Sequence, residues 1–423
     1  MQKFYLYLLC FTTLLLAKSP YLNPYTASEL PKITLQAFVC SKDNMFCIEK
    51  KLSTYDPHEA SFPAEFAPFR SLFARQVEAY YDDDIRAELA SDRNDTPDLS
   101  GNYYRHTDTS LFALTPTTLT LQYERSSYEG GAHGNYGIAY ENFLRSNAAP
   151  VTLKKLFKPG THKKLLAVAE RYYRLAYNIP DDQNMRYDGW FDASFTLAEN
   201  FAITPNGLLF VYNQYEIKPY AAGLTRFLLP YSAIESLIDP KGALAFVRRQ
   251  SHTTQHYTFR EDPLTLTLDV AQTKDVIDLN VTLRSDTCTR SGNWLSLSFP
   301  QLHSKKALLA ADYSRFRQLA TYDTHDKLYN RQLHKNVPAR YLLVEARQPT
   351  VYPNTLYTMH IRLKAPKNLS PLIIDLRALA KTRERTYTAP YDYDGTRGQQ
   401  GYQNYRVLFD LHEIRKKNQG SDR

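Results

Sequence analysis

The sequence is poor in tryptophan and glycine, with 2 and 15 of 423 residues, and it lacks the common short signatures of enzymes. It contains no GxSxG elbow, no P-loop, no GxGxxG after a strand and no HExxH. These absences argue against the commonest hydrolase, nucleotide-binding and metalloprotease designs. Hydrophobic residues make up 43% and charged residues 23%, which excludes a disordered chain and a multi-span membrane protein.

What the sequence does have is tyrosine and phenylalanine, 33 and 21 residues, together with 23 prolines. This composition favours many strands with aromatic faces and well-defined turns. Lysine and arginine exceed aspartate and glutamate by 52 − 44 = +8, a weak preference for anionic envelope polymers. We predict no nucleic-acid partner and no cofactor. The length is typical of two domains after an export segment.

The amino terminus has the pattern of a secretion signal. Lys3 precedes an uncharged run of 14 residues, Phe4 to Ala17, which is too short for a membrane span of about 20 residues. We therefore predict a signal peptide over residues 1–19 and a periplasmic or secreted protein. An uncleaved anchor stays an alternative, and membrane contact is predicted only in that case. A lipidated Cys10 is disfavoured because no small residue precedes it.

Three cysteines follow the signal. Cys40 and Cys47 flank the turn residues Lys42-Asp43-Asn44, between two strand-like runs. In an oxidising compartment this spacing predicts a Cys40–Cys47 disulfide; two reduced core cysteines are the alternative. Cys288 is left over and is expected to be buried.

The first half of the chain mixes helical and strand periodicity. Apolar stripes predict helices over 68–81, 162–177 and 231–237, and alternation or apolar runs predict strands over 118–123, 136–140, 207–212 and 226–229. Because no βαβ rhythm repeats, the predicted class is α+β, with a mostly antiparallel sheet and packed helices.

After residue 240 helical periodicity is scarce and alternation dominates. Apolar residues alternate with polar ones over 264–268, 277–283, 295–299 and 357–363. Such strands over 241–414 predict an all-β immunoglobulin-like sandwich, followed by a basic tail over 415–423.

Two groups of residues suggest catalysis. His252 and His256 have the i, i+4 spacing of metal ligands on a helix, although their surroundings favour a polar linker. The second group consists of four aspartates, which we interpret as a solvated loop or, alternatively, as pairs for acid–base catalysis: Asp181, Asp182, Asp188 and Asp192. These residues support the alternative of a metal-dependent enzyme acting on peptidoglycan or another polysaccharide, but we favour a protein that is not an enzyme.

His133 lies in the glycine turn Tyr128-Glu129-Gly130-Gly131-Ala132-His133-Gly134. A lone histidine there is more often a structural hydrogen-bonding group than a catalyst. This turn is the first of four segments whose order resembles the extracytoplasmic domain of the RsiV anti-sigma factors, a module that also precedes some peptidoglycan deacetylases. The other three segments are Asp188-Gly189-Trp190-Phe191, Asn200 to Leu208, and Tyr215 to Gly223 with Pro230-Tyr231.

The resemblance covers about residues 30–240 and implies an RsiV-like module over 20–240, in two parts with a break near 100–115. Its RsiV members bind lysozyme, and the module has no known catalytic activity. Only Met1–Lys3 precede the apolar run, so we do not expect sigma-factor control. The resemblance therefore implies an exported envelope protein that binds a lysozyme-like muramidase or cell-wall glycan.

The loop Tyr215 to Gly223 is the predicted binding element. Pro219 stiffens it, Gly223 ends it, and Tyr215 and Tyr220 offer contact area at low entropic cost. With His133 these residues form the predicted site. One alternative is that both tyrosines pack on the sheet edge, and another is a structural interaction protein whose sandwich is the working part.

Overall fold

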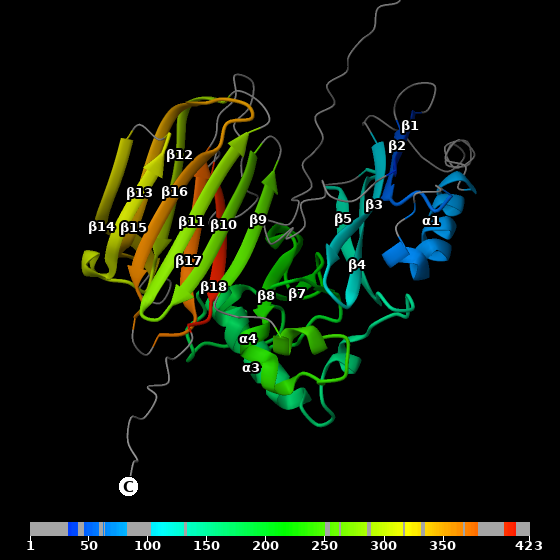
Figure 1. Ribbon diagram of the computed structural model, residues 1–423, viewed down its shortest axis with the longest axis horizontal. Coiled ribbons are helices and arrows are strands. Elements are labelled where there is room, and N and C mark those ends of the chain that lie inside the picture. The colour runs from blue at the N-terminus through cyan, green and yellow to red at the C-terminus, as the bar shows by residue number, and fades with distance from the viewer. Residues whose placement is uncertain are drawn as a thin grey trace, which may run out of the picture.

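A computed structural model shows three sheet-based parts in chain order (Figure 1). The described residues are 33–40, 46–58, 62, 64–82, 103–130, 133–249, 254–261, 264–285, 289–315, 318–330, 335–366, 369–379 and 402–411. None of the helices in these ranges is both long and apolar enough to cross a membrane. The predicted signal, Cys10, His252, Cys288 and the basic tail lie outside these ranges.

The first part is a five-stranded sheet in the order β1-β2-β3-β4-β5. Its strands are β1 (Ile33–Cys40), β2 (Phe46–Thr54), β3 (Tyr103–Leu114), β4 (Thr118–Tyr128) and β5 (Asn135–Leu144). Only the pairing of β2 with β3 is parallel. Because β3 pairs with both β2 and β4, the sheet is continuous through the predicted break near 100–115. The domain boundaries themselves stay predictions.

A helix covers one face of this sheet. The predicted helix over 68–81 is present as a 3-10 turn, Ala64–Phe69, that continues into α1 (Arg70–Asp82). Pro68 ends up in the 3-10 turn, ahead of the α-helix. Phe66, Phe69 and Phe73 are buried with the aromatic and aliphatic residues of the sheet. At the far edge the predicted disulfide is confirmed, since Cys40 and Cys47 are bonded across paired positions of β1 and β2.

The central part packs helices on a small antiparallel sheet. Its elements are α3 (His162–Tyr177), β6 (Phe201–Ile203), β7 (Gly207–Tyr212), β8 (Thr225–Pro230) and α4 (Tyr231–Ile234). Short 3-10 turns complete it: Leu153–Leu156, Met185–Asp188, Tyr220–Ala222, Glu235–Leu237 and Ala245–Arg249. Leu165, Ala169 and Ala176 form the apolar stripe of α3, and Asn178 ends the helix in a left-handed conformation. The helices predicted over 162–177 and 231–237 are thereby confirmed, the latter as α4 with the 3-10 turn that follows it.

The last part consists of two five-stranded antiparallel sheets. The first has the order β13-β16-β11-β10-β9 and the second β14-β15-β12-β17-β18. Its strands are β9 (Thr254–Glu261), β10 (Leu264–Thr273), β11 (Val276–Ser285), β12 (Thr289–Phe299), β13 (Leu308–Ser314), β14 (Gln318–Asn330), β15 (Lys335–Val351), β16 (Tyr357–Lys364), β17 (Leu372–Leu379) and β18 (Tyr402–Phe409). A 3-10 turn, Lys305–Ala307, precedes β13.

Both of these sheets contribute to one buried core, which makes the arrangement sandwich-like. Leu268, Leu279 and Ile361 come from the first sheet, and Leu297 and Val344 from the second. The predicted strands are present, and burial alternates over 265–268, 277–283 and 357–363; every second residue of β11, for example, is buried. Over 295–299 the alternation fails, because Ser296 and Ser298 of β12 are buried as well.

The sandwich is joined to the central part through its lower end in Figure 1. Ile373 of β17 and Leu408 of β18 belong to the core of the central part. Asp410 accepts hydrogen bonds from Tyr172 of α3 and Ser232 of α4. Burial, followed by the charge of Asp410 and the hydrogen bond to it, raises the pKa of Tyr172. The two parts therefore share buried apolar and polar contacts.

Candidate binding site at the junction of the first and central sheets

One edge of β5 pairs with no further strand of the first sheet and is covered instead by side-chain amides from the central part. Three backbone N–H groups donate to them: Tyr136 to Gln214 at 3.3 Å, Ile138 to Asn213 at 2.8 Å, and Tyr140 to Asn200 at 2.9 Å. These amides take the place of a sixth strand, because every second residue of an edge strand points its N–H outward. The amide clasp, defined as Asn200, Asn213 and Gln214, joins the first sheet to the central sheet.

A fourth side-chain amide, that of Asn142, extends this junction into the interior. The Asn142 side chain of β5 donates to the Phe201 carbonyl at 2.8 Å and accepts from the Ile203 N–H at 2.8 Å. The Thr120 hydroxyl also donates to Asn142 at 2.7 Å. Because all of these groups are buried and paired, the two sheets are held in one relative position.

The clasp brings together aromatic rings from segments about 80 residues apart. We define the aromatic cluster as His133, Tyr136, Tyr215 and Tyr220. The His133 ring stacks on Tyr220, with ring centres 3.6 Å apart and planes at 17°, and Tyr136 meets Tyr220 edge-on at 6.3 Å. Tyr215 lies 5.9 Å from Tyr220, and its hydroxyl is 3.4 Å from Nε2 of His133. The site residues His133, Tyr215 and Tyr220 are thus found together.

The cluster is presented to solvent by a shaped loop. Tyr215 is 55% exposed and has a left-handed backbone with φ of 64°, which is uncommon for a bulky residue. Gly223 ends the loop at φ 67° and ψ −154°, a region that essentially only glycine occupies. Gly223 is buried, so its role in the site is to shape the backbone. Pro219 is exposed and precedes the 3-10 turn that carries Tyr220.

The glycine turn contributes His133 to the aromatic cluster and approaches β4 closely. Gly134 follows His133, and a Cβ atom at Gly134 would lie 2.6 Å from the carbonyl oxygen of Ser127. Glycine is therefore required for the close approach of the turn to β4. The Tyr104 hydroxyl lies beside Gly134, and burial, followed by the proximity of Tyr220, raises the Tyr104 pKa.

A buried ion pair connects this loop to the aspartate-rich segment. Lys218 Nζ lies 2.5 Å from Asp188 Oδ2, with side chains only 7% and 13% exposed. Asp188 also accepts a hydrogen bond from the Tyr173 hydroxyl, which in turn accepts one from the Trp190 indole. The Lys218 ammonium also lies 4.5 Å from the centre of the Tyr177 ring, a cation–π distance. The pair fixes the loop that displays Tyr215 and Tyr220.

This finding corrects the interpretation of the aspartates as one solvated loop. Asp181, Asp182 and Asp192 are exposed, whereas Asp188 is held in the interior by a paired lysine. The sequence pattern did not distinguish the four aspartates, because the partner of Asp188 is 30 residues away.

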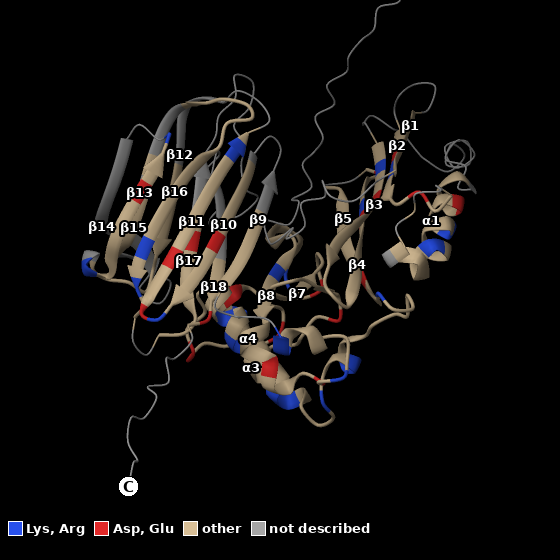
Figure 2. Cartoon of the chain, in the orientation of Figure 1, with Lys and Arg blue, Asp and Glu red and all other residues tan. Residues whose placement is uncertain are grey.

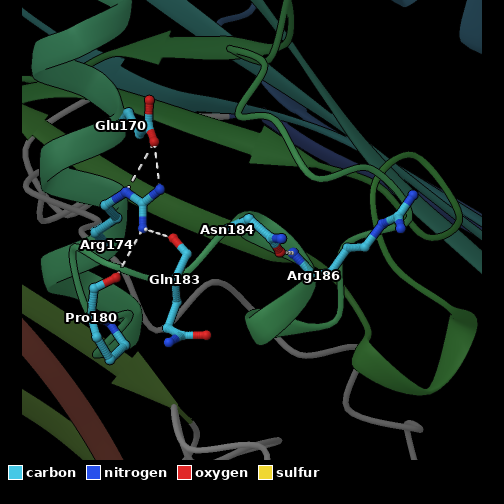
Figure 3. Close-up of polar contacts among 6 residues, drawn as sticks. All are labelled: Glu170, Arg174, Pro180, Gln183, Asn184 and Arg186. Atoms are coloured by element: carbon cyan, nitrogen blue, oxygen red, sulfur yellow. Dashed lines mark hydrogen bonds and ion pairs between the residues drawn. The ribbon is translucent and has the colours of Figure 1, made fainter.

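Arg174 stabilises the segment before Asp188. Its guanidinium binds the Glu170 carboxylate and the carbonyls of Pro180 and Gln183 (Figure 3). Next to it in Figure 3, the Asn184 side chain caps the turn by accepting from the Arg186 N–H at 3.0 Å.

The histidine pair was also misread. His256 lies in β9, where its Nδ1 is 2.5 Å from Asp269 of β10, so it belongs neither to a helix nor to a linker. The strand at His256 contradicts the helix that i, i+4 pairing of metal ligands requires, and His252 lies outside the described residues. Within the described ranges, no group of three or more histidine, cysteine, aspartate or glutamate side chains is arranged to hold a metal ion.

The arrangement of the aromatic cluster suits binding. His133 and Tyr215 are exposed and Tyr136 and Tyr220 half-buried, so rings held by the amide clasp offer a preorganised aromatic surface. The sequence did not indicate Asn200, Asn213 and Gln214 as structural determinants of the site. Their polar side chains suit any loop, and the available signals were that Asn200 begins the third segment of the resemblance and that Asn213 and Gln214 directly precede Tyr215.

Residues 154–232 match the family described as "Protein of unknown function (DUF3298)". A DUF3298 family protein from Pseudomonas aeruginosa is 16% identical with a TM-score of 0.38, over 50% of this chain and 96% of that one. A DUF3298 member from Bacteroides fragilis is 18% identical with a TM-score of 0.37, over 49% and 92%. No curated protein matches the chain. The matched range contains α3, the central sheet and the loop with Tyr215 and Tyr220.

Proposed function

We propose that this protein is an exported cell-envelope binding protein without catalytic activity, and that its aromatic cluster binds a lysozyme-like muramidase. The observation that carries the proposal is the convergence of His133, Tyr215 and Tyr220 into one aromatic cluster at the surface, in which His133 and Tyr215 are exposed. Two tyrosines on a rigid loop are typical of protein interface anchors, because they bury much area for little lost entropy.

The resemblance to RsiV ectodomains supports this proposal, because all four of its segments meet at one place. The glycine turn carries His133, the second segment carries Asp188, the third carries Asn200 of the clasp, and the fourth carries the loop. In this proposal residues 30–240 are an RsiV-like module, and the sandwich is an immunoglobulin-like unit that presents it. The match to DUF3298 is compatible with such a module.

Local charge also supports a basic partner, although the chain as a whole is basic. Glu216 follows Tyr215, is exposed, and accepts a hydrogen bond from the clasp residue Asn213 at 3.1 Å. Glu129 lies in the glycine turn with a side chain 53% exposed, paired with Arg105. A net charge of +8 opposes the approach of a basic lysozyme, so binding at this cluster is expected to depend on these local carboxylates.

Titration calorimetry against a c-type lysozyme, at low and physiological salt, tests the proposal. We expect saturable one-to-one binding that Tyr220→Ala or Tyr215→Ala weakens by at least about tenfold, as at an interface hot spot. Tyr352→Ala is the matched control, because Tyr352 is also 55% exposed but lies in the sandwich.

Two results would redirect or remove the proposal. Binding of soluble peptidoglycan fragments in place of lysozyme, with the same loss in Tyr220→Ala, would identify a glycan as the ligand of the same cluster. Absence of saturable binding to both ligands, or an equal loss in Tyr352→Ala, would refute a binding role for these tyrosines.

A further inference from the structure

The loop between β15 and β16 exposes two large apolar side chains. Tyr352 is 55% and Leu356 50% exposed, and Pro353 and Asn354 between them are exposed as well. We define the sandwich tip as this loop, 352–356, with Arg284 at the end of β11 and Arg315 after β13. Single exposed apolar residues are ordinary on protein surfaces. Two in one five-residue loop, flanked by arginines, form a distinct feature.

The tip loop is held in shape by polar contacts. The Tyr352 N–H donates to the hydroxyl of the buried Tyr357 at 3.1 Å, and the Asn354 N–H donates to the Ser285 carbonyl at 3.2 Å. Asn354 itself has a left-handed backbone with φ of 56°. The loop therefore cannot relax onto the sandwich to bury Tyr352 and Leu356 without breaking these hydrogen bonds.

Two exposed arginines flank the apolar side chains. Leu283 and Tyr357 form the last backbone pair of β11 and β16. Beyond this pair lie Arg284 of β11 and Leu356, the loop residue that directly precedes β16. Arg284 donates to the neutral Asn354 amide at 3.2 Å, so it retains its charge. Arg315 directly follows Ser314 of β13, on the other side of β16. Neither arginine forms an ion pair with any residue in the described ranges.

The tip lies at the end of the sandwich that faces away from the central part. In Figure 1 the arrowhead of β11 points upward, whereas α3 and α4 contact the sandwich from below. Figure 2 shows a basic residue at the head of β11 in blue. In Figure 1 the described central part and first sheet lie away from this end.

We propose that the sandwich tip docks on an anionic phospholipid bilayer. Tyrosine and leucine are suited to the boundary between headgroups and acyl chains, because both bury apolar area and the tyrosine hydroxyl stays hydrated. Arginines beside them attract anionic headgroups and extend their apolar stems along the surface. One apolar or one cationic signal gives only marginal membrane binding, and the tip combines the two.

Co-sedimentation of the purified full-length protein with vesicles tests this proposal. Vesicles of phosphatidylcholine alone are compared with vesicles containing phosphatidylglycerol, at low and physiological salt. We expect partitioning that requires phosphatidylglycerol and weakens with salt. Every variant carries the same Phe4–Ala17 run, so differences between variants report on the tip.

Matched pairs of variants locate the effect. Leu356→Ser and Tyr352→Ser together are expected to lower the partition coefficient by about tenfold. Leu309→Ser is the control, because Leu309 is 51% exposed on the same sandwich but at the opposite end of β13. Arg284→Gln is expected to lower the partition coefficient about fivefold. Arg362→Gln should leave the partition coefficient unchanged, because Arg362 is exposed near the other end of β16. Circular dichroism checks that all variants fold.

Three outcomes would overturn the proposal: wild-type protein that ignores phosphatidylglycerol, a Leu309→Ser loss equal to that of Leu356→Ser, or displacement from vesicles by soluble glycerophosphate at millimolar concentration. The last result would mean that the tip recognises a phosphate group rather than a bilayer. The proposal is independent of the aromatic cluster, since Tyr215→Ala should bind vesicles normally.

Discussion

The central part and the sandwich each have a large buried core, but the two cores are stabilised in different ways. The central core is rich in rings and contains hydrogen-bonded polar groups, such as Tyr173 with Trp190 and Asp188 with Lys218. The sandwich core is mainly aliphatic, with rows of leucine, isoleucine and valine from two sheets. The first arrangement depends on specific partners, and the second on the volume and alternation of apolar residues.

Because of this difference, we expect the two parts to tolerate different kinds of amino-acid substitution. A buried polar pair is destabilised by removing either partner, because the other is left charged in the interior. An aliphatic core accepts a side chain of similar volume but not a cavity. Three experiments test this contrast, each measured as the free energy of unfolding in denaturant.

Lys218→Met should have the largest effect, a loss of about 3–5 kcal/mol, because Asp188 would lose its buried counterion. Lys164→Met on the exposed face of α3 is the control and should change stability by less than about 0.5 kcal/mol. A loss in Lys218→Met no larger than that of the control would show that specific polar partners do not stabilise the central part.

Leu279→Ala should lower the stability of the sandwich by about 3 kcal/mol, because Leu279 is fully buried between its sheets. Leu279→Met, which nearly conserves volume, should cost less than about 1.5 kcal/mol. Asn280→Ala, one residue on and exposed, serves as the control. Equal losses for the alanine and methionine variants would contradict a core specified by volume.

The smallest effect is expected at the surface of the sandwich. A hydrogen bond to Asp269 is the main cause that raises the pKa of His256 above its usual value of about 6.5. A raised pKa in the folded state stabilises the protein below pH 6.5 or so, and this stabilisation disappears as pH rises through the folded pKa. Wild type should therefore exceed His256→Gln in stability at pH 5.5 but not at pH 8.5.

Because the His256 side chain is 49% exposed, that difference should be below about 1 kcal/mol. Denaturant curves of both proteins at the two pH values measure it. A stability advantage that grows with pH would contradict the assignment of the His256–Asp269 pair.

Much of the fold follows from local patterns. Alternation predicted β10, β11, β12 and β16, and apolar stripes predicted α1 and α3. The Cys40–Cys47 bond followed from two short strands around turn residues. These features were predictable because each depends on residues close together in the chain, whose period of two or 3.6 decides which side chains face the core.

The candidate site was predictable only in part. Tyr215, Tyr220 and His133 were named from the sequence, but nothing local indicated that the rings stack. The amide clasp joins residues 60 to 78 positions apart, and an asparagine that covers a strand edge has the same local pattern as one in a loop. Asp188 and His256 were misread for the same reason, since their partners lie on other elements.

Local sequence patterns were enough to predict the secondary structure of the segments with regular apolar periodicity, the sheet-rich class and the disulfide, because burial of a periodic face and closure of a short turn are local requirements. Which strand edges meet, which charges are buried and which tyrosines and leucines stay exposed became known only from the folded structure. Those outcomes depend on partners that distant segments supply, and a polar or aromatic side chain satisfies its hydrogen bonds and packing equally well with many alternatives until the chain is folded.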